Sequence, residues 1–388
     1  MNKRKILFIA SALDGSTINQ GISGGEVRLA EIIKAFIKNN WEVHFLANKN
    51  NNIFCEHFNL NNVINHNFNI QYNNTRFWFI KFTLKVLFTL PESLKDFKGN
   101  IYTANEQLYD VIPAVKLKLN NSNIWTAIVH WLPPYKFWQR KKSNWYNSLI
   151  FMLAEMISIL LIKYLADKSL AVSNSTRNQL LKIGFSKNKV IAVECGVDFG
   201  LITQISKKKS RKEFDAVFIK RIQAVKGVFD LIDIWKLVLK KIPNVKLAII
   251  GGSIDNSLLI NEIRKEKLYN NISFFGPIID FKKKIQILLS SKLFILPSYE
   301  ENWAIVIGEA MACKIPVLAY GLHELIDVWK NNFFPIKVGN KGEFARTIIR
   351  YLGNEKLRIS QADIGYKYIQ QFDWKKIAER EVKIIQSL

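Results

Sequence analysis

The sequence predicts an α/β protein with two domains. Short apolar runs bounded by Pro, Gly or Ser alternate with longer segments whose apolar residues recur at helical spacing, most clearly in the stretch 291–320. Such an alternation builds open sheets of parallel strands covered by helices. A single hydrophobic core stops growing near about 250–300 residues. A chain of 388 residues is therefore expected to divide into two domains of ordinary size.

The stretch 291–320 is predicted to form one strand–turn–helix–strand unit with acidic residues at a ligand-binding edge. Ligands of open α/β sheets bind beyond the carboxyl ends of the strands, and Glu301 and Glu309 follow the first strand of this unit. The two glutamates lie about two helical turns apart. Carboxylates there can bind the hydroxyls of a polyol, and a helix N-terminus favours a phosphate. The pattern indicates a nucleotide sugar, and two solvated surface glutamates are the alternative.

Composition favours anionic partners and a reducing compartment. The chain has 56 basic and 32 acidic residues and a formal net charge of +24, so nucleotide diphosphates, acidic lipids or nucleic acid are the expected partners. Its cysteines, Cys55, Cys195 and Cys313, are too few and too scattered for a disulfide framework, which fits the cytoplasm. Cys55, His57 and His66 lack a fourth ligand at a sensible spacing, so no metal site is expected.

The apolar segments predict core elements rather than a signal peptide or a membrane span. The run Ile6–Ala10 is too short for a signal peptide and is predicted to be a first strand. The longest apolar stretch, 149–165, is interrupted by Glu155 and Lys163. It falls short of about 18–20 clean apolar residues, and a buried helix is expected there.

The N-terminal unit differs from a dinucleotide-binding motif. Strands over 5–10 and 42–47 are expected to flank a helix over 24–38. A dinucleotide-binding fold places its glycines directly after the first strand and an acidic residue after the second. Here a long loop comes first and the second strand ends at Asn48, which excludes a hydride-transfer enzyme. The adjacent Gly24 and Gly25 at the helix start let the backbone approach a ligand closely.

The motif that begins at Pro297-Ser298 carries a family resemblance. It continues with Glu301, then Glu309-Ala-Met-Ala, then Ile315-Pro-Val. This string resembles the donor-binding signature of retaining glycosyltransferases of family four (glycosyl transferases group 1). The resemblance implies the GT-B fold, in which two Rossmann-like β/α/β domains face each other across a cleft. It covers nearly the whole chain and is strongest over 214–320.

The resemblance also implies where the domains lie. Residues 1–198 correspond to the acceptor-binding domain and residues 199–372 to the domain that binds the nucleotide-sugar donor. The final segment, 373–388, is expected to pack back on the first domain, as it does in the family.

In the first domain the resemblance assigns four site residues. Gly24, Gly25 and Arg28 resemble the Gly-Gly and following Arg that face the donor phosphates and the acceptor. His130 follows a predicted strand over 124–129 and matches a histidine near the reacting carbon of the donor sugar.

In the second domain Arg221 and Lys226 are expected to bind the diphosphate. Two cations across a loop can straddle a diphosphate, and the pair resembles the Arg-loop-Lys-Gly element of the family. The resemblance implies that Glu301 contacts sugar hydroxyls and that Glu309 contacts the ribose. The complete set expected to bind the donor in this domain is Arg221, Lys226, Glu301, Asn302, Trp303, Ala304 and Glu309. The set expected to take part in catalysis is His130, Arg221, Lys226 and Glu301.

Several residues depart from the family pattern. Lys220 replaces the glycine before the arginine, and Lys314 replaces the glycine after Ala-Met-Ala-Cys. Cys195 departs from the Asn-Gly-Val-Asp element that closes the first domain in the family. Asn302-Trp303-Ala304 replaces the usual Gly-Phe-Gly, and Trp303 is expected to shield the sugar.

The expected chemistry uses no cofactor and no metal. The sequence contains no Asp-x-Asp motif. Arg221, Lys226 and the helix N-terminus near Asn302 are therefore expected to stabilise the leaving diphosphate. The resemblance implies transfer with retention of anomeric configuration.

Two segments favour a membrane surface. Residues 76–90 combine Arg76, Lys81 and Lys85 with large apolar residues, and 131–146 interleaves aromatic and basic residues. Amphipathic rings and cations suit an anionic headgroup layer, and a half-buried helix and a packed loop are the alternatives. No nucleic-acid-binding signature accompanies them, so nucleic acid is not expected.

Together these features predict a hexosyltransferase that uses a UDP- or GDP-sugar. The expected acceptor is a glycan or a lipid-linked glycan of cell-envelope synthesis, and the expected place is the inner face of the cell membrane, as a peripheral cytoplasmic protein. The alternatives are a nucleotide-sugar epimerase or hydrolase of the same fold, and a non-catalytic membrane scaffold with a decayed site.

Overall fold

The computed structural model describes residues 3–71, 78–132, 145–208, 210–252 and 256–388. Arg76 and residues 133–144 of the aromatic–basic segment lie outside this part. The described chain forms two compact units. Unit 1 comprises Met1–Ile18, Gly25–Glu194 and Ile377–Leu388, and unit 2 comprises Asn19–Gly24 and Cys195–Lys376.

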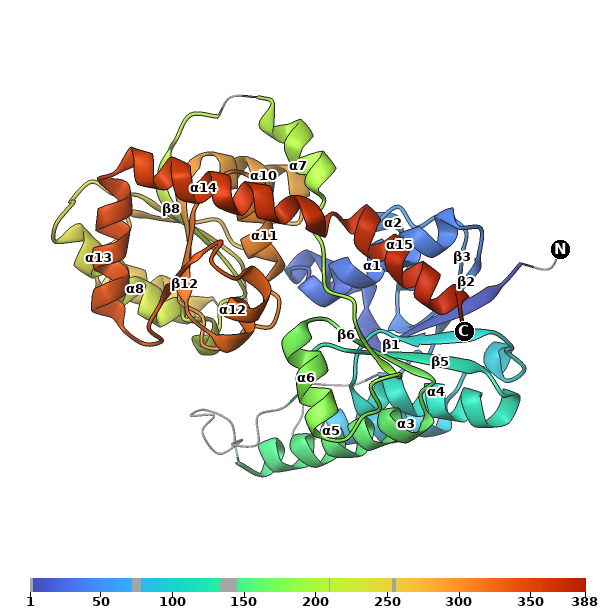
Figure 1. Cartoon of the computed structure of the whole chain (residues 1–388). Helices are drawn as coiled ribbons and strands as arrows, with labels where there is room; N and C mark the ends of the chain where they lie inside the picture. The colour runs from blue at the N-terminus through green and yellow to red at the C-terminus, as the bar shows by residue number, and fades with distance from the viewer. Residues whose placement is uncertain (1–2, 72–77, 133–144, 209, 253–255) are drawn as a thin grey trace. The chain divides into compact units, whose positions relative to one another are not determined.

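Unit 1 is a seven-stranded parallel sheet with helices on both faces. The strand order is β3-β2-β1-β4-β5-β6-β7. The strands are β1 (Lys5–Asp14), β2 (Glu42–Lys49), β3 (Val63–Asn67), β4 (Asn100–Thr103), β5 (Ile124–Val129), β6 (Lys168–Ala171) and β7 (Val190–Ala192). The helices are α1 (Gly24–Lys38), α2 (Asn51–His57), α3 (Trp78–Phe88), α4 (Leu108–Asn121), α5 (Trp145–Leu165), α6 (Asn174–Lys182) and α15 (Trp374–Gln386). Figure 1 shows α1, α2 and α15 on one side of this sheet and α3, α4 and α5 on the other.

Unit 2 is a six-stranded parallel sheet of order β10-β9-β8-β11-β12-β13. Its strands are β8 (Phe214–Ile219), β9 (Leu247–Ile250), β10 (Ile272–Phe274), β11 (Ser291–Leu296), β12 (Val317–Tyr320) and β13 (Phe334–Ile336). Its helices are α7 (Phe199–Ser206), α8 (Val228–Leu239), α9 (Ser257–Lys265), α10 (Phe281–Leu289), α11 (Ile305–Ala312), α12 (His323–Trp329), α13 (Lys341–Leu352) and α14 (Glu355–Ile369). The predicted α/β class with two Rossmann-like domains is confirmed.

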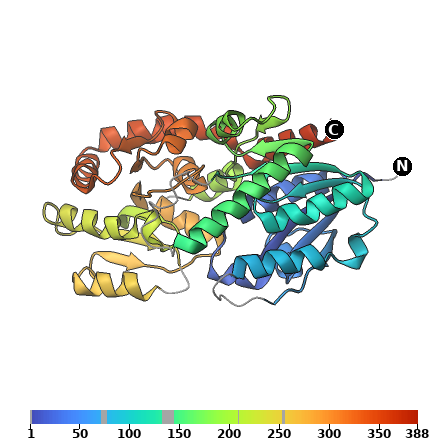
Figure 2. The same ribbon diagram turned by 90° about the horizontal axis from the view of Figure 1, so that it is seen from below.

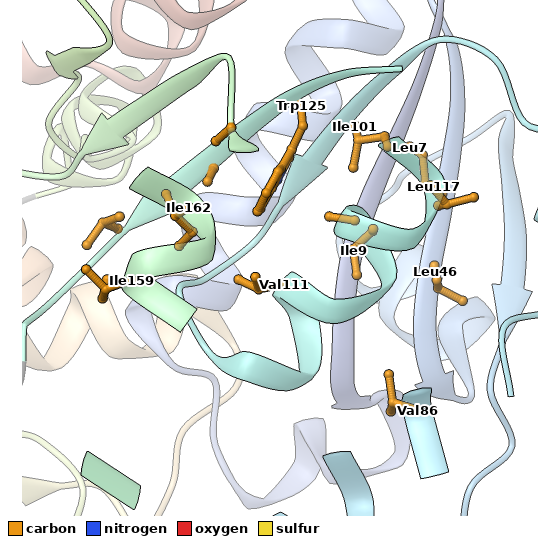
Figure 3. Packing of buried hydrophobic residues seen from close by; sticks show 14 of the residues in the cluster. Leu7, Ile9, Leu46, Val86, Ile101, Val111, Leu117, Trp125, Ile159 and Ile162 are labelled. Carbon is orange, nitrogen blue, oxygen red and sulfur yellow. The ribbon is translucent and has the colours of Figure 1, made fainter. Parts of the chain in front are cut away.

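The core of unit 1 fills the space between the sheet and helices α3, α4 and α5. Trp125 of β5 is fully buried, and Val111 of α4 and Ile162 of α5 lie in the same cluster (Figure 3). These helices bury the apolar residues that recur at helical spacing, so the burial of nonpolar surface holds them on the sheet.

The prediction of a buried helix over 149–165 is wrong for one face of α5. This face bears the exposed side chains of Leu153, Met156, Ile157, Leu160 and Tyr164. In the part of the chain that the structure describes, no helix is long and apolar enough to cross a membrane.

Candidate functional site

The carboxyl ends of neighbouring strands β8 and β11 bring a buried glutamate together with three cations. The two strands pair in parallel, so the loops that follow them leave the same edge of the sheet. Glu301 follows β11, and its side chain is 4% exposed. Lys220, Arg221 and Lys226 follow β8. The expectation that Glu301, Arg221 and Lys226 share one site thus agrees with their placement in unit 2.

Two lysines hold the Glu301 carboxylate. Lys220 Nζ lies 2.6 Å from Oε2, and Lys226 Nζ lies 3.3 Å from Oε1. Burial by itself raises the pKa of Glu301, but the charges of the two lysines outweigh it and the pKa lies below its ordinary value. Burial in turn lowers the pKa of Lys226, and Glu301 opposes that change. The site therefore carries an ionised glutamate and, with exposed Arg221, an excess of positive charge.

Glycine backbone fixes the loop that carries Lys226. Gly227 has φ 73°, and a Cβ there would lie 1.7 Å from the Pro297 carbonyl oxygen. Only glycine permits both this conformation and this approach. Lys226 Nζ also donates to the Glu300 carbonyl oxygen. The Lys-Gly pair and the Pro-Ser turn, which are 70 residues apart in sequence, are thereby packed together.

Glu309 makes a second buried ion pair on α11. Its side chain is 6% exposed, and Oε1 lies 2.7 Å from Lys284 Nζ of α10. The other oxygen, Oε2, is buried and accepts no hydrogen bond from the residues that the structure describes. An acceptor of this kind matches the expected contact with a ribose hydroxyl, because a buried oxygen without a donor costs free energy until a ligand supplies one.

Two residues that stand where the family has glycine adopt a left-handed backbone. Ala304, which precedes α11, has φ 53°, and Lys314 has φ 54°. Both values lie in the left-handed region that glycine adopts without cost. The Trp303 ring is 3% exposed and packs 4.4 Å from Trp329, centroid to centroid. The ring is part of the core of unit 2, and its expected contact with the sugar stays a prediction, as does that of Asn302.

In unit 1 the histidine at the end of β5 is held by hydrogen bonds at two points. The His130 backbone N–H donates to Glu106 Oε2 over 2.8 Å, and ring Nε2 lies 3.0 Å from the Ala104 carbonyl oxygen. Burial and then the charge of Arg28 lower the pKa of His130 to about 4. The ring is neutral at pH 7, and the carbonyl fixes the proton on Nε2, which leaves Nδ1 as the basic nitrogen.

Arg28 lies in a buried network in unit 1. Its guanidinium forms an ion pair with Glu381 of α15, and both side chains are at most 2% exposed. Arg28 Nη1 donates to the Tyr102 hydroxyl over 2.8 Å, and that hydroxyl donates to Glu381 Oε2 over 3.0 Å. This gives Arg28 a structural role, and its contact with donor phosphates stays a prediction. Gly24 and Gly25 are the exposed first residues of α1.

The described residues include no group of three or more His, Cys, Asp or Glu that could hold a metal ion. Cys55, Cys195 and Cys313 are buried and form no disulfide bond.

Two family models together match almost the whole chain. "Glycosyltransferase Family 4" matches residues 22–200, and "Glycosyl transferases group 1" matches residues 202–368. The chain belongs to the GT-B glycosyltransferases of group 1. The second match contains Lys220, Arg221, Lys226, Glu301 and Glu309, so the geometry described for unit 2 lies in the group 1 region.

Relatives of this glycosyltransferase occur in bacteria and archaea. An uncharacterized glycosyltransferase of Haemophilus influenzae is 21% identical over 372 residues, 93% of this chain and 96% of that protein. An uncharacterized glycosyltransferase of Methanocaldococcus jannaschii is 25% identical over 257 residues, 64% of this chain and 65% of that protein. A second one from the same organism is matched over 60% of its length.

Solved structures share the fold of this glycosyltransferase. Anabaena HepE in complex with UDP and glucose superposes with a TM-score of 0.75 at 17% identity, over 99% of this chain and 100% of that one. Sucrose-phosphate synthase of Thermosynechococcus elongatus has a TM-score of 0.75 at 18% identity, over 99% of both chains.

Sequence reasoning missed three residues of these sites. Lys220 was interpreted only as a lost glycine, and Lys284 and Glu106 were not singled out. All three act through partners more than 20 residues away in sequence. The sequence did contain a signal for Lys220, because a lysine beside Arg221 at a strand end can reach the Glu301 carboxylate.

Proposed function

We propose that this glycosyltransferase transfers a hexose from a UDP- or GDP-sugar to a glycan or lipid-linked acceptor of the cell envelope, with retention of configuration and without a metal ion. The observation that carries the proposal is Glu301, held between Lys220 and Lys226 beside Arg221. Support for the donor comes from the fold relatives, because HepE is described in complex with UDP and with UDP-glucose. In line with this proposal, the protein works as a peripheral protein on the inner face of the cell membrane.

In the proposed mechanism the residues of unit 2 act on the donor. Arg221 and Lys226 bind the diphosphate and stabilise the negative charge that develops as the glycosidic bond breaks, because preorganised cations need no rearrangement during the step. Glu301 accepts hydrogen bonds from sugar hydroxyls and fixes the ring relative to the diphosphate. Glu309 Oε2 accepts a hydrogen bond from the ribose. In unit 1, neutral His130 offers Nδ1 to the donor sugar.

Binding of nucleotides tests the proposal. The midpoint of thermal unfolding is measured with UDP, GDP, ADP or CMP for the native chain, for Glu309→Gln and for the control Glu355→Gln. The control alters an exposed glutamate of α14. A ligand at 100 times its Kd raises the free energy of unfolding of the protein that binds it by about 2.7 kcal/mol. We expect one diphosphate to stabilise the native chain and the control selectively, and Glu309→Gln to lose that response.

Equal responses to all four nucleotides, or an unchanged response of Glu309→Gln, would contradict the donor site. The nucleotide sugar of the selected nucleoside diphosphate is then supplied as donor. If the nucleotide is released only when a glycan acceptor is present, the result supports transfer. Release or interconversion of the sugar without any acceptor would instead identify a hydrolase or an epimerase.

A further inference from the structure

Besides the core residues Ile159 and Ile162, helix α5 buries two polar residues, and it exposes a stripe of apolar ones. Glu155 and Ser158 are 0% exposed, and Ser158 Oγ donates to the Glu106 carbonyl oxygen over 2.5 Å. The outward side chains are Leu153 (48% exposed), Met156 (52%), Ile157 (51%), Leu160 (49%) and Tyr164 (69%). Their spacing of three, four or seven residues places them in one stripe. A helix covered by water has the opposite polarity, so a nonaqueous surface is expected over this stripe.

Helix α3, on the same side of the sheet, also exposes apolar side chains. Leu84 is 51% and Phe88 is 79% exposed. The two helices lie near each other on the same side of the sheet, since the rings of Phe79 on α3 and Phe151 on α5 are 5.5 Å apart. Figure 2 shows α5 and its neighbouring helices on the face turned toward the viewer. We call Leu84, Phe88, Leu153, Met156, Ile157, Leu160 and Tyr164 the α3/α5 face.

Lysines outnumber exposed carboxylates around the α3/α5 face. Helices α3, α4 and α5 contain two acidic residues, Asp110 and Glu155, and both are 0% exposed. The lysines of the same helices are Lys81, Lys85, Lys116, Lys118 and Lys163. Lys81 and Lys85 are exposed beside Leu84. The exposed carboxylates Glu92 and Asp167, which follow α3 and α5, each pair with a lysine. An apolar stripe bordered by an excess of lysines is complementary to an anionic lipid surface.

We propose that the α3/α5 face docks on an anionic phospholipid bilayer, with α5 lying in the plane of the headgroups. None of the described helices could cross the bilayer, so the helix lies on it. A second copy of this chain is disfavoured as the occupant, because pairing would place two lysine-rich surfaces of a chain with net charge +24 against each other. The inference rests on the proposed membrane-proximal function and names the surface that performs it.

Cosedimentation of the full chain with vesicles tests the proposal. The vesicles contain phosphatidylcholine alone or an equal mixture with phosphatidylglycerol. We expect the native chain to bind the anionic vesicles at least about tenfold more tightly at low salt. The double variant Met156→Gln/Leu160→Gln is expected to lose about tenfold or more of that affinity, because two apolar side chains no longer enter the acyl boundary.

The matched control is Leu258→Gln/Ile359→Gln, which removes two equally exposed apolar side chains from α9 and α14 of unit 2. It is expected to bind as the native chain does. A second variant, Lys81→Gln/Lys85→Gln, is expected to lose roughly fivefold per lysine toward anionic vesicles and to change little toward neutral ones.

Three results would overturn the inference. One is native binding to neutral and anionic vesicles alike, and another is equal binding by Met156→Gln/Leu160→Gln. The third is a native dimer in sedimentation that Met156→Gln/Leu160→Gln converts to monomer, which would assign the face to a second copy. The thermal response to UDP or GDP is measured on every variant. If the native chain fails to bind anionic vesicles but responds to the nucleotide, only the docking face is overturned. If the native chain shows no nucleotide response, the proposed function is overturned.

Discussion

The buried carboxyl groups of the two units have different partners. In unit 2, Glu301 and Glu309 each lie within 2.7 Å of a lysine nitrogen. In unit 1, Glu106, Asp110 and Glu155 form no ion pair among the described residues, and backbone N–H groups are the donors to the first two. Both oxygens of Glu155 are buried without a hydrogen-bond donor in the described chain.

This difference decides which groups stay ionised. The charge of Lys220 and Lys226 lowers the pKa of Glu301 despite its burial. Burial raises the pKa of Glu106 to about 7, of Asp110 to about 8 and of Glu155 to about 9. Glu301 thus stays ionised in unit 2, whereas Asp110 and Glu155 in unit 1 hold their protons at neutral pH.

The largest expected effect comes from the buried ion pair between Arg28 and Glu381 in unit 1. Glu381→Leu leaves the buried Arg28 guanidinium without its carboxylate and is expected to lower the free energy of unfolding by about 3–5 kcal/mol. Urea denaturation measures the loss. The double variant Arg28→Met/Glu381→Leu removes both charges and is expected to recover most of it. If the single variant is as stable as the native chain, the pair does not contribute to the stability of unit 1.

The second prediction concerns a variant that removes the charge of Glu301 in unit 2. Glu301→Gln keeps the shape of the side chain but leaves Lys220 and Lys226 without a counter-charge and weakens the contact with the sugar. We expect kcat/KM for sugar transfer to fall by about 100- to 1,000-fold, the usual range for one group that stabilises a transition state. The fall is measured from initial rates of the native chain, Glu301→Gln and the control Glu355→Gln. A fall of less than threefold would remove Glu301 from the mechanism.

The third prediction concerns the unpaired Glu155. The unfolded chain releases this proton above about pH 4.5, whereas the folded chain holds it to about pH 9. The native stability therefore falls as pH rises between these values, by up to about 1.4 kcal/mol per pH unit. Glu155→Gln cannot ionise, so it is expected to match the native chain near pH 4 and to exceed it by about 3 kcal/mol at pH 7. A constant difference across a urea series from pH 4 to 9 would contradict the raised pKa.

The smallest effect is expected at an exposed pair. Lys95 Nζ lies 2.6 Å from Glu92 Oε1, with the side chains 58% and 88% exposed. Water screens this pair, and Glu92→Gln is expected to change the free energy of unfolding by less than about 0.5 kcal/mol. The same urea experiment measures it and gives the baseline for the buried pairs. A loss above 1 kcal/mol would show that distance rather than burial sets the value of these ion pairs.

Local sequence patterns predicted the helices and strands well, because apolar spacing reflects which side chains each element buries. The helix expected over 24–38 is α1, because its apolar residues recur at helical spacing and it begins at adjacent glycines. The strand expected over 124–129 is β5. The motif residues Glu301 and Lys226 form an ion pair, because both follow strands that end at one edge of the sheet.

Contacts between distant residues could not be predicted in this way. Lys220 and Glu301 are 81 residues apart, and only the parallel pairing of β8 and β11 brings them together. For α5, composition indicated an apolar helix but not which face is inside. The inner face packs Ile159 and Ile162 into the core of unit 1, and such tertiary contacts are not encoded in a local pattern.

The closure of unit 1 by α15 has a consequence for biosynthesis. Arg28 leaves the ribosome early, but Glu381 is 353 residues behind it. At about 5–20 residues per second, the nascent N-terminal unit waits roughly 20–70 s for the carboxylate that neutralises its buried guanidinium. Its sheet therefore cannot reach its final stability until Glu381 has been synthesised. A premature stop codon that removes only Ile377–Leu388 damages the first domain to be synthesised rather than the last.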